Sequence, residues 1–244
     1  MCKKSVLTLI VVSSLFVVTA PLQATLTLVD LSVNTSGTIT AATGQLTVFE
    51  RYNDPPTGTG VFKPFVRIQG KGIEKGYNTD GSAEFDTKGG KWTHSLKLGD
   101  IPVSTNGDIQ LLLDINQSQG GNNRYLSLDV MKIFLADSGS LDNYGSGLGT
   151  LIYDLGDNWV KMDNTLFGPG SGTGDVRVTI NIPEITGWSS NKYFYLYSEF
   201  GKYNSSNGGF EEWAIAVPTV VPEPATIVLL GLGALSLLRK RFRR

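Results

Sequence analysis

Strict alternation of apolar and polar residues between positions 175 and 182 is the feature that most constrains the fold. Val176, Val178, Ile180 and Ile182 alternate with polar side chains, and this period of two predicts a strand with one buried face. Nothing between residues 25 and 217 shows a sustained helical period of 3.6 residues. We therefore expect an all-β fold, a single antiparallel sandwich or jelly-roll-like domain.

Alternation of this kind, bounded by turn residues, recurs along the chain. It predicts strands over residues 25–33, 45–52, 61–69, 108–116, 125–135, 148–155, 159–162, 175–182, 193–200 and 210–217. The apolar phase shifts near residue 130, which predicts a β-bulge there. Pro64 predicts an edge strand or a bulge, because proline cannot donate a ladder hydrogen bond. The Gly156-Asp157-Asn158 segment has the composition of a hairpin turn, whereas residues 70–90 have the composition of a loop.

Residues 1–24 have the pattern of a secretory signal peptide. Lys3 and Lys4 precede an apolar stretch over residues 6–18, and Ala24 offers a small residue for cleavage. We expect cleavage after Ala24, which would remove Cys2, the only cysteine. The predicted domain over residues 25–217 then has no disulfide, so its stability must come from its core, from ions or from partners.

The C-terminal residues predict a membrane segment that is short for a permanent span. After a linker over residues 218–224, an apolar run covers the 14 residues 225–238, roughly 21 Å as a helix against the ~30 Å of a bilayer core. The run and its basic tail fill residues 225–244. Cations favour the cytoplasmic side, and those that end the run are Arg239, Lys240, Arg241, Arg243 and Arg244.

Val221 precedes Pro222, Glu223 and Pro224, and together with the apolar run and the basic tail this order resembles the PEP-CTERM sorting signal of Gram-negative bacteria. The resemblance implies export by the Sec machinery, an inner-membrane-anchored precursor and processing by an exosortase. It further implies delivery to the cell surface or extracellular matrix, in a biofilm or exopolysaccharide context. The sorting motif itself would be Pro222-Glu223-Pro224.

The net charge of −1 hides an acidic domain. Of the 21 Lys and Arg residues, two lie in residues 1–24 and five follow residue 238, which leaves 14. Of the 22 Asp and Glu residues, only Glu223 lies outside the domain, so 21 acids face 14 bases, a net charge of −7. An acidic surface argues against nucleic acid as a partner. It is compatible with divalent cations that bridge the domain to acidic polysaccharide.

The residues argue against catalysis, so we expect a protein that is not an enzyme. His94 is the only histidine, and the chain lacks the Gly-x-Ser-x-Gly turn of a serine hydrolase. Without cysteine in the domain, a Cys-His pair and a conventional zinc site are both excluded. The glycine-rich segment 168–174 is followed by Asp175 and a strand rather than by Lys and a helix, so it predicts a loop. A hydrolase is the less favoured alternative.

Carboxylates offer the one metal-binding alternative. Asp154, Asp157 and Asp163 surround the predicted turn, and Asp137 and Asp142 lie in a Ser/Gly/Asn segment. Oxygen-rich loops can hold calcium, but no segment has EF-hand spacing. We therefore expect no cofactor, with a calcium ion somewhere in the domain as the alternative.

Tyrosines suggest a second function. Tyr193, Tyr195 and Tyr197 fall on one face of a predicted strand, with Phe194 and other apolar side chains on the opposite face. Tyrosine combines an apolar ring with a polar tip, and such a row could stack on sugar rings. Tyrosine is also an ordinary strand former. The row therefore supports a carbohydrate-binding module as the alternative to a purely structural surface protein.

Overall fold

The computed structural model describes residues 26–52, 62–167, 172 and 174–216. The predicted signal peptide with its cleavage after Ala24, the sorting motif, the apolar run and the basic tail all lie outside these residues. So do the Pro/Gly-rich residues 54–58 and most of the glycine-rich segment 168–174. Within the described part of the chain, none of the helical turns has the length and apolarity needed to cross a bilayer.

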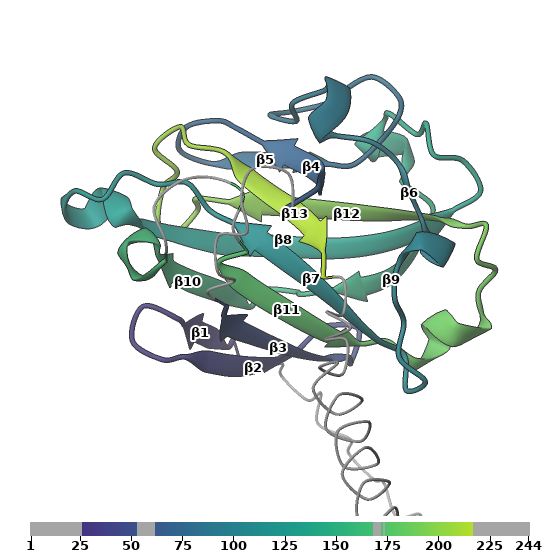
Figure 1. The fold of residues 1–244 in the computed structure, drawn as a ribbon, viewed down its shortest axis with the longest axis horizontal. Helices are drawn as coiled ribbons and strands as arrows, with labels where there is room; N and C mark the ends of the chain where they lie inside the picture. The colour runs from purple at the N-terminus through teal and green to yellow at the C-terminus, as the bar shows by residue number, and fades with distance from the viewer. Residues whose placement is uncertain (1–25, 53–61, 168–171, 173, 217–244) are drawn as a thin grey trace, which may run out of the picture.

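Two sheets pack face to face, as the alternating pattern predicts, and their strands cross at an angle (Figure 1). The first sheet has the order β1-β10-β8-β12-β5, with β9 beside β8 and β6 beside β12. Its strands are β1 (Leu28–Asp30), β5 (Glu74–Tyr77), β6 (Leu96–Lys97), β8 (Tyr125–Ala136), β9 (Thr150–Asp154), β10 (Trp159–Asp163) and β12 (Tyr193–Phe200). We call this sheet A.

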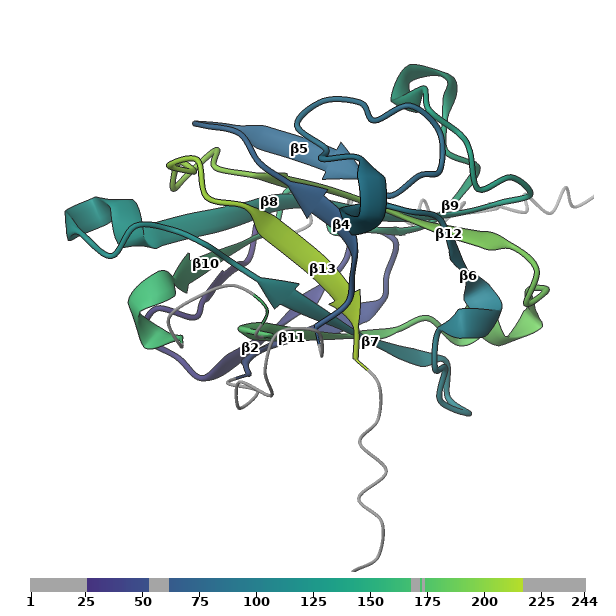
Figure 2. The same ribbon diagram turned by 45° about the horizontal axis from the view of Figure 1, so that its top comes forward.

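The second sheet, sheet B, has the order β2-β3-β11-β7-β13-β4. Its strands are β2 (Ser36–Thr40), β3 (Leu46–Arg51), β4 (Pro64–Ile68), β7 (Asp108–Asp114), β11 (Val176–Asn181) and β13 (Glu211–Ile215). Figure 2 shows β13 and β7 on the near side of the sandwich, with β8 and β12 behind them. The described helical segments are short 3₁₀ turns, such as Tyr144–Ser146.

The core lies between the sheets and contains the apolar phase of each strand. Val176, Val178 and Ile180 of β11 are fully buried against Leu126 and Leu128 of β8 and their neighbours in one cluster. Burial of this kind contributes about 25 cal/mol for each Å² of apolar surface removed from water. The alternation therefore predicted β7, β11 and β12 together with the face that each of them buries, but it did not predict β2, β5 or β6.

Both bulge predictions are confirmed. On β8, Glu199 of β12 pairs with Val130 and Phe200 with Leu128, which leaves Asp129 as the extra residue. On β4, Trp213 pairs with Val66 and Ala214 with Pro64, so the ladder shifts beside the proline. Strand β4 is also the last strand of sheet B, where a residue without an N–H costs no ladder hydrogen bond.

The expected hairpin at residues 156–158 is wrong. Strand β9 pairs antiparallel with residues 132–135 of β8, and β10 pairs antiparallel with residues 125–128 of the same strand. The two strands therefore run in one direction, end to end along β8. The hydrogen bonds of Asn158 explain why the chain continues from β9 into β10 without reversing. Its Nδ2 donates to the carbonyl of Leu155 at 2.8 Å, and its Oδ1 accepts the Thr27 N–H at 2.8 Å.

The expectation of purely antiparallel sheets also needs one correction. Strand β1 pairs in parallel with β10, through Leu28 with Trp159 and Asp30 with Lys161. The chain then turns at residues 31–35 into β2 of sheet B, so these first strands tie the two sheets together at one edge. A second difference is β5, which lies inside the segment expected to be a loop.

Candidate functional site

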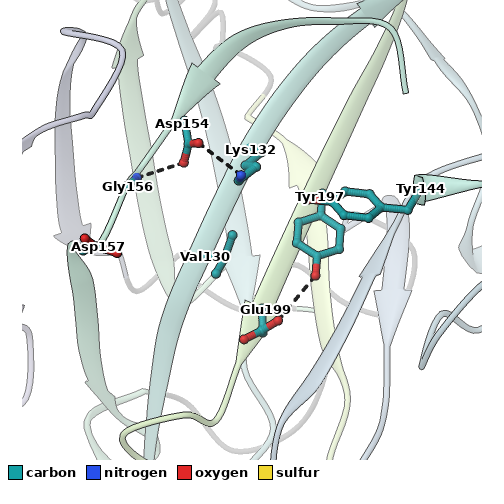
Figure 3. Close-up of a pocket in the computed structure, with 8 residues that line it drawn as sticks. All are labelled: Val130, Lys132, Tyr144, Asp154, Gly156, Asp157, Tyr197 and Glu199. Atoms are coloured by element: carbon teal, nitrogen blue, oxygen red, sulfur yellow. Dashed lines mark hydrogen bonds and ion pairs between the residues drawn. The ribbon is translucent and has the colours of Figure 1, made fainter. Parts of the chain in front are cut away.

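A groove of about 350 Å³ opens on the outer face of sheet A (Figure 3). It is built by two central strands, by the junction between β9 and β10, and by the 3₁₀ turn at 144–146. Its lining residues are Val130, Lys132, Tyr144, Asp154, Gly156, Asp157, Tyr197 and Glu199. We call it the outer groove.

Strand register places these side chains in rows. Lys132 of β8 pairs with Asp154 of β9 on one side and with Tyr197 of β12 on the other. In the next row, Val130 pairs with Glu199. Side chains at i and i+2 of a strand share a face, so one alternation directs both rows outward. The end-to-end arrangement of β9 and β10 brings Asp157 beside them.

Charge in the groove is predominantly negative. The Nζ of Lys132 forms an ion pair with Asp154 at 3.1 Å, and the other oxygen of Asp154 accepts the N–H of Gly156 at 2.9 Å. Glu199 accepts a long hydrogen bond of 3.4 Å from the hydroxyl of Tyr197. Asp157 is exposed. Because the single lysine is already paired with Asp154, the groove presents a net acidic surface to a ligand.

Two tyrosines form the aromatic wall of the outer groove. The rings of Tyr144 and Tyr197 stack with their centroids 4.3 Å apart and an interplanar angle of 22°. Burial is the main cause that raises the pKa of each phenol above its ordinary value. Both hydroxyls therefore stay protonated at neutral pH and can donate hydrogen bonds.

The groove offers hydrogen bonding and stacking to a ligand. Carboxylates accept hydrogen bonds from hydroxyl or ammonium groups, phenols donate and accept them, and the exposed part of the Tyr144 ring provides an apolar surface. Polar groups beside a partly exposed aromatic ring suit a polyhydroxylated ligand such as a sugar. Among the described residues, no group of three or more His, Cys, Asp or Glu side chains is placed to hold a metal ion.

The tyrosine row lies where the alternation predicted, but it is not an open platform. Tyr195 is 0% exposed and Tyr197 is 4% exposed, since residues 138–144 cover them. The Tyr195 hydroxyl donates to the carbonyl of Ser138 at 2.8 Å and accepts the N–H of Leu141 at 3.0 Å. Tyr193 is only half-buried. The structure thus corrects the expected three-residue stacking face, because two of its rings belong to a second, outer core.

The predicted carboxylate cluster assembles only in part, because Asp154 and Asp157 both line the outer groove whereas Asp163 does not, and the corrected hairpin explains why. Asp154 lies beside Lys132, while Asp163 pairs with Tyr125 near the other end of β8. Seven residues of strand separate those two positions, roughly 23 Å at about 3.3 Å per residue. Asp163 instead lies 3.3 Å from the Nε of Arg124.

The other carboxylates and the histidine have separate local partners. Asp137 pairs with the Nζ of Lys192 at 2.5 Å, and Asp142 accepts the N–H of Ser82 at 3.3 Å. His94 is exposed, and its Nδ1 lies 2.8 Å from the carbonyl oxygen of Ser95. None of these residues lines the outer groove.

Sequence reasoning missed three residues of the groove. Tyr144 comes from a Ser/Gly/Asn-rich segment that carries no periodic signal. Lys132 and Glu199 are outward, polar positions of β8 and β12. Their alternation could have placed each of them on the outer face, but only the pairing of β8 with β12 brings them into neighbouring rows.

Comparison with known families identifies a motif at the C-terminal end of the chain. Residues 220–244 match the family model described as the PEP-CTERM protein-sorting motif. A signal of this kind implies an exported protein that is anchored transiently in the membrane before processing. The motif also implies an exosortase as the processing partner, so the resemblance noted from Pro222-Glu223-Pro224 and its surroundings is confirmed. No curated protein and no solved structure matches the chain.

Proposed function

We propose that residues 25–217 form a non-catalytic component of the cell surface or extracellular matrix, delivered by the Sec machinery and released at Pro222-Glu223-Pro224. The match of residues 220–244 to the sorting motif is the observation that carries this proposal. The net charge of −7 between the two terminal segments supports it, because a strongly charged surface keeps an exported domain soluble.

Replacing Pro222, Glu223 and Pro224 together by alanine tests the sorting step. The variant should accumulate as a larger, membrane-retained form, because the exosortase loses its recognition motif while the apolar run remains. Immunoblots of membrane, cell-surface and medium fractions measure this. Pro218→Ala, a few residues upstream, is the matched control and should be processed normally. Unchanged size and location of the triple variant would refute the proposal.

The second candidate function is glycan binding in the outer groove. Its support is the stacked pair Tyr144 and Tyr197 beside Asp154, Asp157 and Glu199. Three carboxylates against one paired lysine repel uronic acids and other anionic sugars. We therefore infer that the groove selects neutral or amino sugars, and that exopolysaccharide of this kind is the ligand.

Affinity electrophoresis of the purified protein on a panel of neutral, amino-sugar and anionic polysaccharides tests this function. Tyr144→Ala should weaken retardation by up to about tenfold, because the loss of an aromatic contact costs about 0.5–1.5 kcal/mol. Tyr203→Ala is the matched control, since Tyr203 is an exposed tyrosine that stacks on Trp159 outside the groove. Retardation only by anionic polysaccharide, or equal loss in both variants, would exclude the groove as the binding site.

The proposal that the domain is not an enzyme has its own test. A screen of polysaccharide and ester substrates should show no turnover by the purified protein. His94→Ala is the diagnostic variant, because His94 is the only imidazole in the chain. Turnover by the wild type that is lost in His94→Ala would establish the hydrolase alternative.

A further inference from the structure

Two glutamate side chains from different sheets meet in the interior. Glu74 begins β5 at the edge of sheet A, and Glu211 begins β13 in sheet B. Both residues are 0% exposed. Their carboxyl groups lie within hydrogen-bonding reach of each other. The pair therefore connects the two sheets at a position that water does not reach.

Each carboxyl group has one satisfied oxygen and one oxygen without a partner. The Oε2 of Glu74 accepts the N–H of Gly70, and the Oε1 of Glu211 accepts the Nε2–H of Gln117 at 2.5 Å. The N–H of Asn116 also donates to Glu211. Glu74 Oε1 and Glu211 Oε2 remain buried without a hydrogen-bond donor. A single proton held between the two carboxyl groups would supply the donor that both oxygens lack.

No cation is placed to neutralise the pair. In the part of the chain that the structure describes, neither glutamate forms an ion pair with lysine or arginine. Lys75 is the nearest cation to Glu74 in the sequence, but its Nζ lies over the Phe85 ring, 4.7 Å from the ring centroid, and the guanidinium of Arg67 pairs with Glu212 at 2.6 Å. The adjacent carboxylate of Asp86 accepts the N–H of Lys75 at 3.0 Å and adds no positive charge.

Two ionised carboxylates at this position would be buried, unpaired and mutually repulsive. Burial and the neighbouring Glu74 raise the pKa of Glu211 well above its ordinary value. A carboxyl–carboxylate pair that holds one proton removes one of the two charges and supplies the missing hydrogen bond. Such a pair titrates as a unit rather than as two separate groups.

We propose that Glu74 and Glu211 share one proton at neutral pH and form a proton-dependent clasp between the two sheets. Loss of the proton leaves two buried like charges, which favours separation of β5 from β13. Because β5 is the outermost strand of sheet A along its main order, it is the element that opens. Tyr77, at the end of β5, lies 6.4 Å from the ring of Tyr144, so opening of β5 would also loosen the outer groove.

The direction of the pH effect follows from linkage. In the folded state the pKa of Glu211 is raised well above its ordinary value, whereas in the unfolded chain Glu211 titrates near that value. The stabilisation is therefore fully present below the unfolded pKa and is lost as the pH rises through the folded pKa. Between those values, one extra proton in the folded state makes the unfolding equilibrium constant rise about tenfold for each pH unit.

Urea unfolding of the full-length protein in detergent, from pH 5 to pH 9, tests the clasp. Glu211→Gln keeps the side-chain shape, and its amide can donate permanently to Glu74 Oε1. For each pH unit, the unfolding equilibrium constant of the wild type should rise about tenfold more than that of Glu211→Gln. Glu184→Gln, at an exposed position, is the control and should retain the wild-type slope. Equal slopes for Glu211→Gln and the wild type would overturn the proposal.

Infrared spectroscopy of the wild type gives a second measurement that does not depend on a variant. A protonated carboxyl band should be present at neutral pH and vanish as the pH rises, and absence of that band would overturn the proposal.

Calcium bound by the two carboxylates is the competing explanation. If calcium stabilises the wild type but not Glu211→Gln at neutral pH, a bound cation rather than a shared proton holds the pair, and the clasp is refuted.

Discussion

At the scale of single residues, Gly76 shows how close the packing against β5 is. A Cβ at this position would lie 2.3 Å from the Oγ1 of Thr87 and 3.0 Å from a side-chain carbon of Ile68. That space is occupied because Thr87 Oγ1 accepts the N–H of Tyr77 at 3.3 Å. The residues after β5 therefore fold back over the strand, and only glycine leaves room for them.

Gly76→Ala should therefore destabilise the protein by about 2 kcal/mol, the usual cost of overpacking a filled interior. Chemical denaturation with a fluorescence readout measures this change. Gly120→Ala is the matched control and should be close to neutral, since a Cβ there meets no atom within 4 Å and the backbone is extended. The double variant Gly76→Ala/Thr87→Ala should recover part of the loss, and strict additivity of the two changes would contradict the steric explanation.

At the scale of elements, the junction between β9 and β10 depends on one side chain. Asn158 donates to the carbonyl oxygens of Leu155 and Thr40 and accepts from the N–H of Thr27. It thus joins β10 to the residue before β1 in sheet A and to the end of β2 in sheet B. A Gly-Asp-Asn sequence fits a hairpin and this straight-through junction equally well, which is why composition gave the wrong prediction.

Asn158→Ala should cost about 3 kcal/mol, because it removes three hydrogen bonds, one of them to the buried carbonyl of Leu155. Hydrogen exchange should show the amides of β1 losing protection first, since β1 is held to the sheet beside this residue. Asn122→Ala, at an exposed position in a 3₁₀ turn, should leave exchange unchanged. Uniform loss of protection over both sheets would show that Asn158 does not act locally.

The segment 138–144, which covers Tyr195 and Tyr197, is a second element that can be tested. Tyr195→Phe removes the hydroxyl that bonds Ser138 and Leu141 but keeps the ring in the outer core. It should cost about 1 kcal/mol and increase hydrogen exchange across residues 138–144. Tyr203→Phe, whose ring is 47% exposed, should change neither quantity. Unaltered exchange in Tyr195→Phe would mean that other contacts hold the cover.

The sequence predicts the inward face of this fold better than the outward face. Alternation identified β7, β8, β11 and β12 because their apolar residues must fill one shared core. It missed β5, whose first residue is a buried glutamate and whose third is glycine, both poor strand signals. It missed the outer groove because Tyr144, Lys132 and Glu199 meet only through strand pairing and a covering turn, which no local pattern records.

At the scale of the whole molecule, the two sheets share one hydrophobic core. Their inward residues belong to a single cluster that includes Phe49 of β3, Phe194 of β12 and Trp213 of β13. Trp213 is fully buried, and its Nε1–H donates to the hydroxyl of Ser198 in β12 at 3.1 Å. It is therefore a direct polar link between sheet B and sheet A.

Trp213→Phe should lower the free energy of unfolding by about 2 kcal/mol, through lost volume and an unpaired Ser198 hydroxyl. Because the core is shared, the protection of amides that exchange by global opening should fall equally in β8 of sheet A and β11 of sheet B. Trp159→Phe is the control, since Trp159 is only half-buried against Tyr203. If Trp213→Phe lowers protection in sheet B while sheet A keeps its full value, the two sheets unfold separately and the shared core does not couple them.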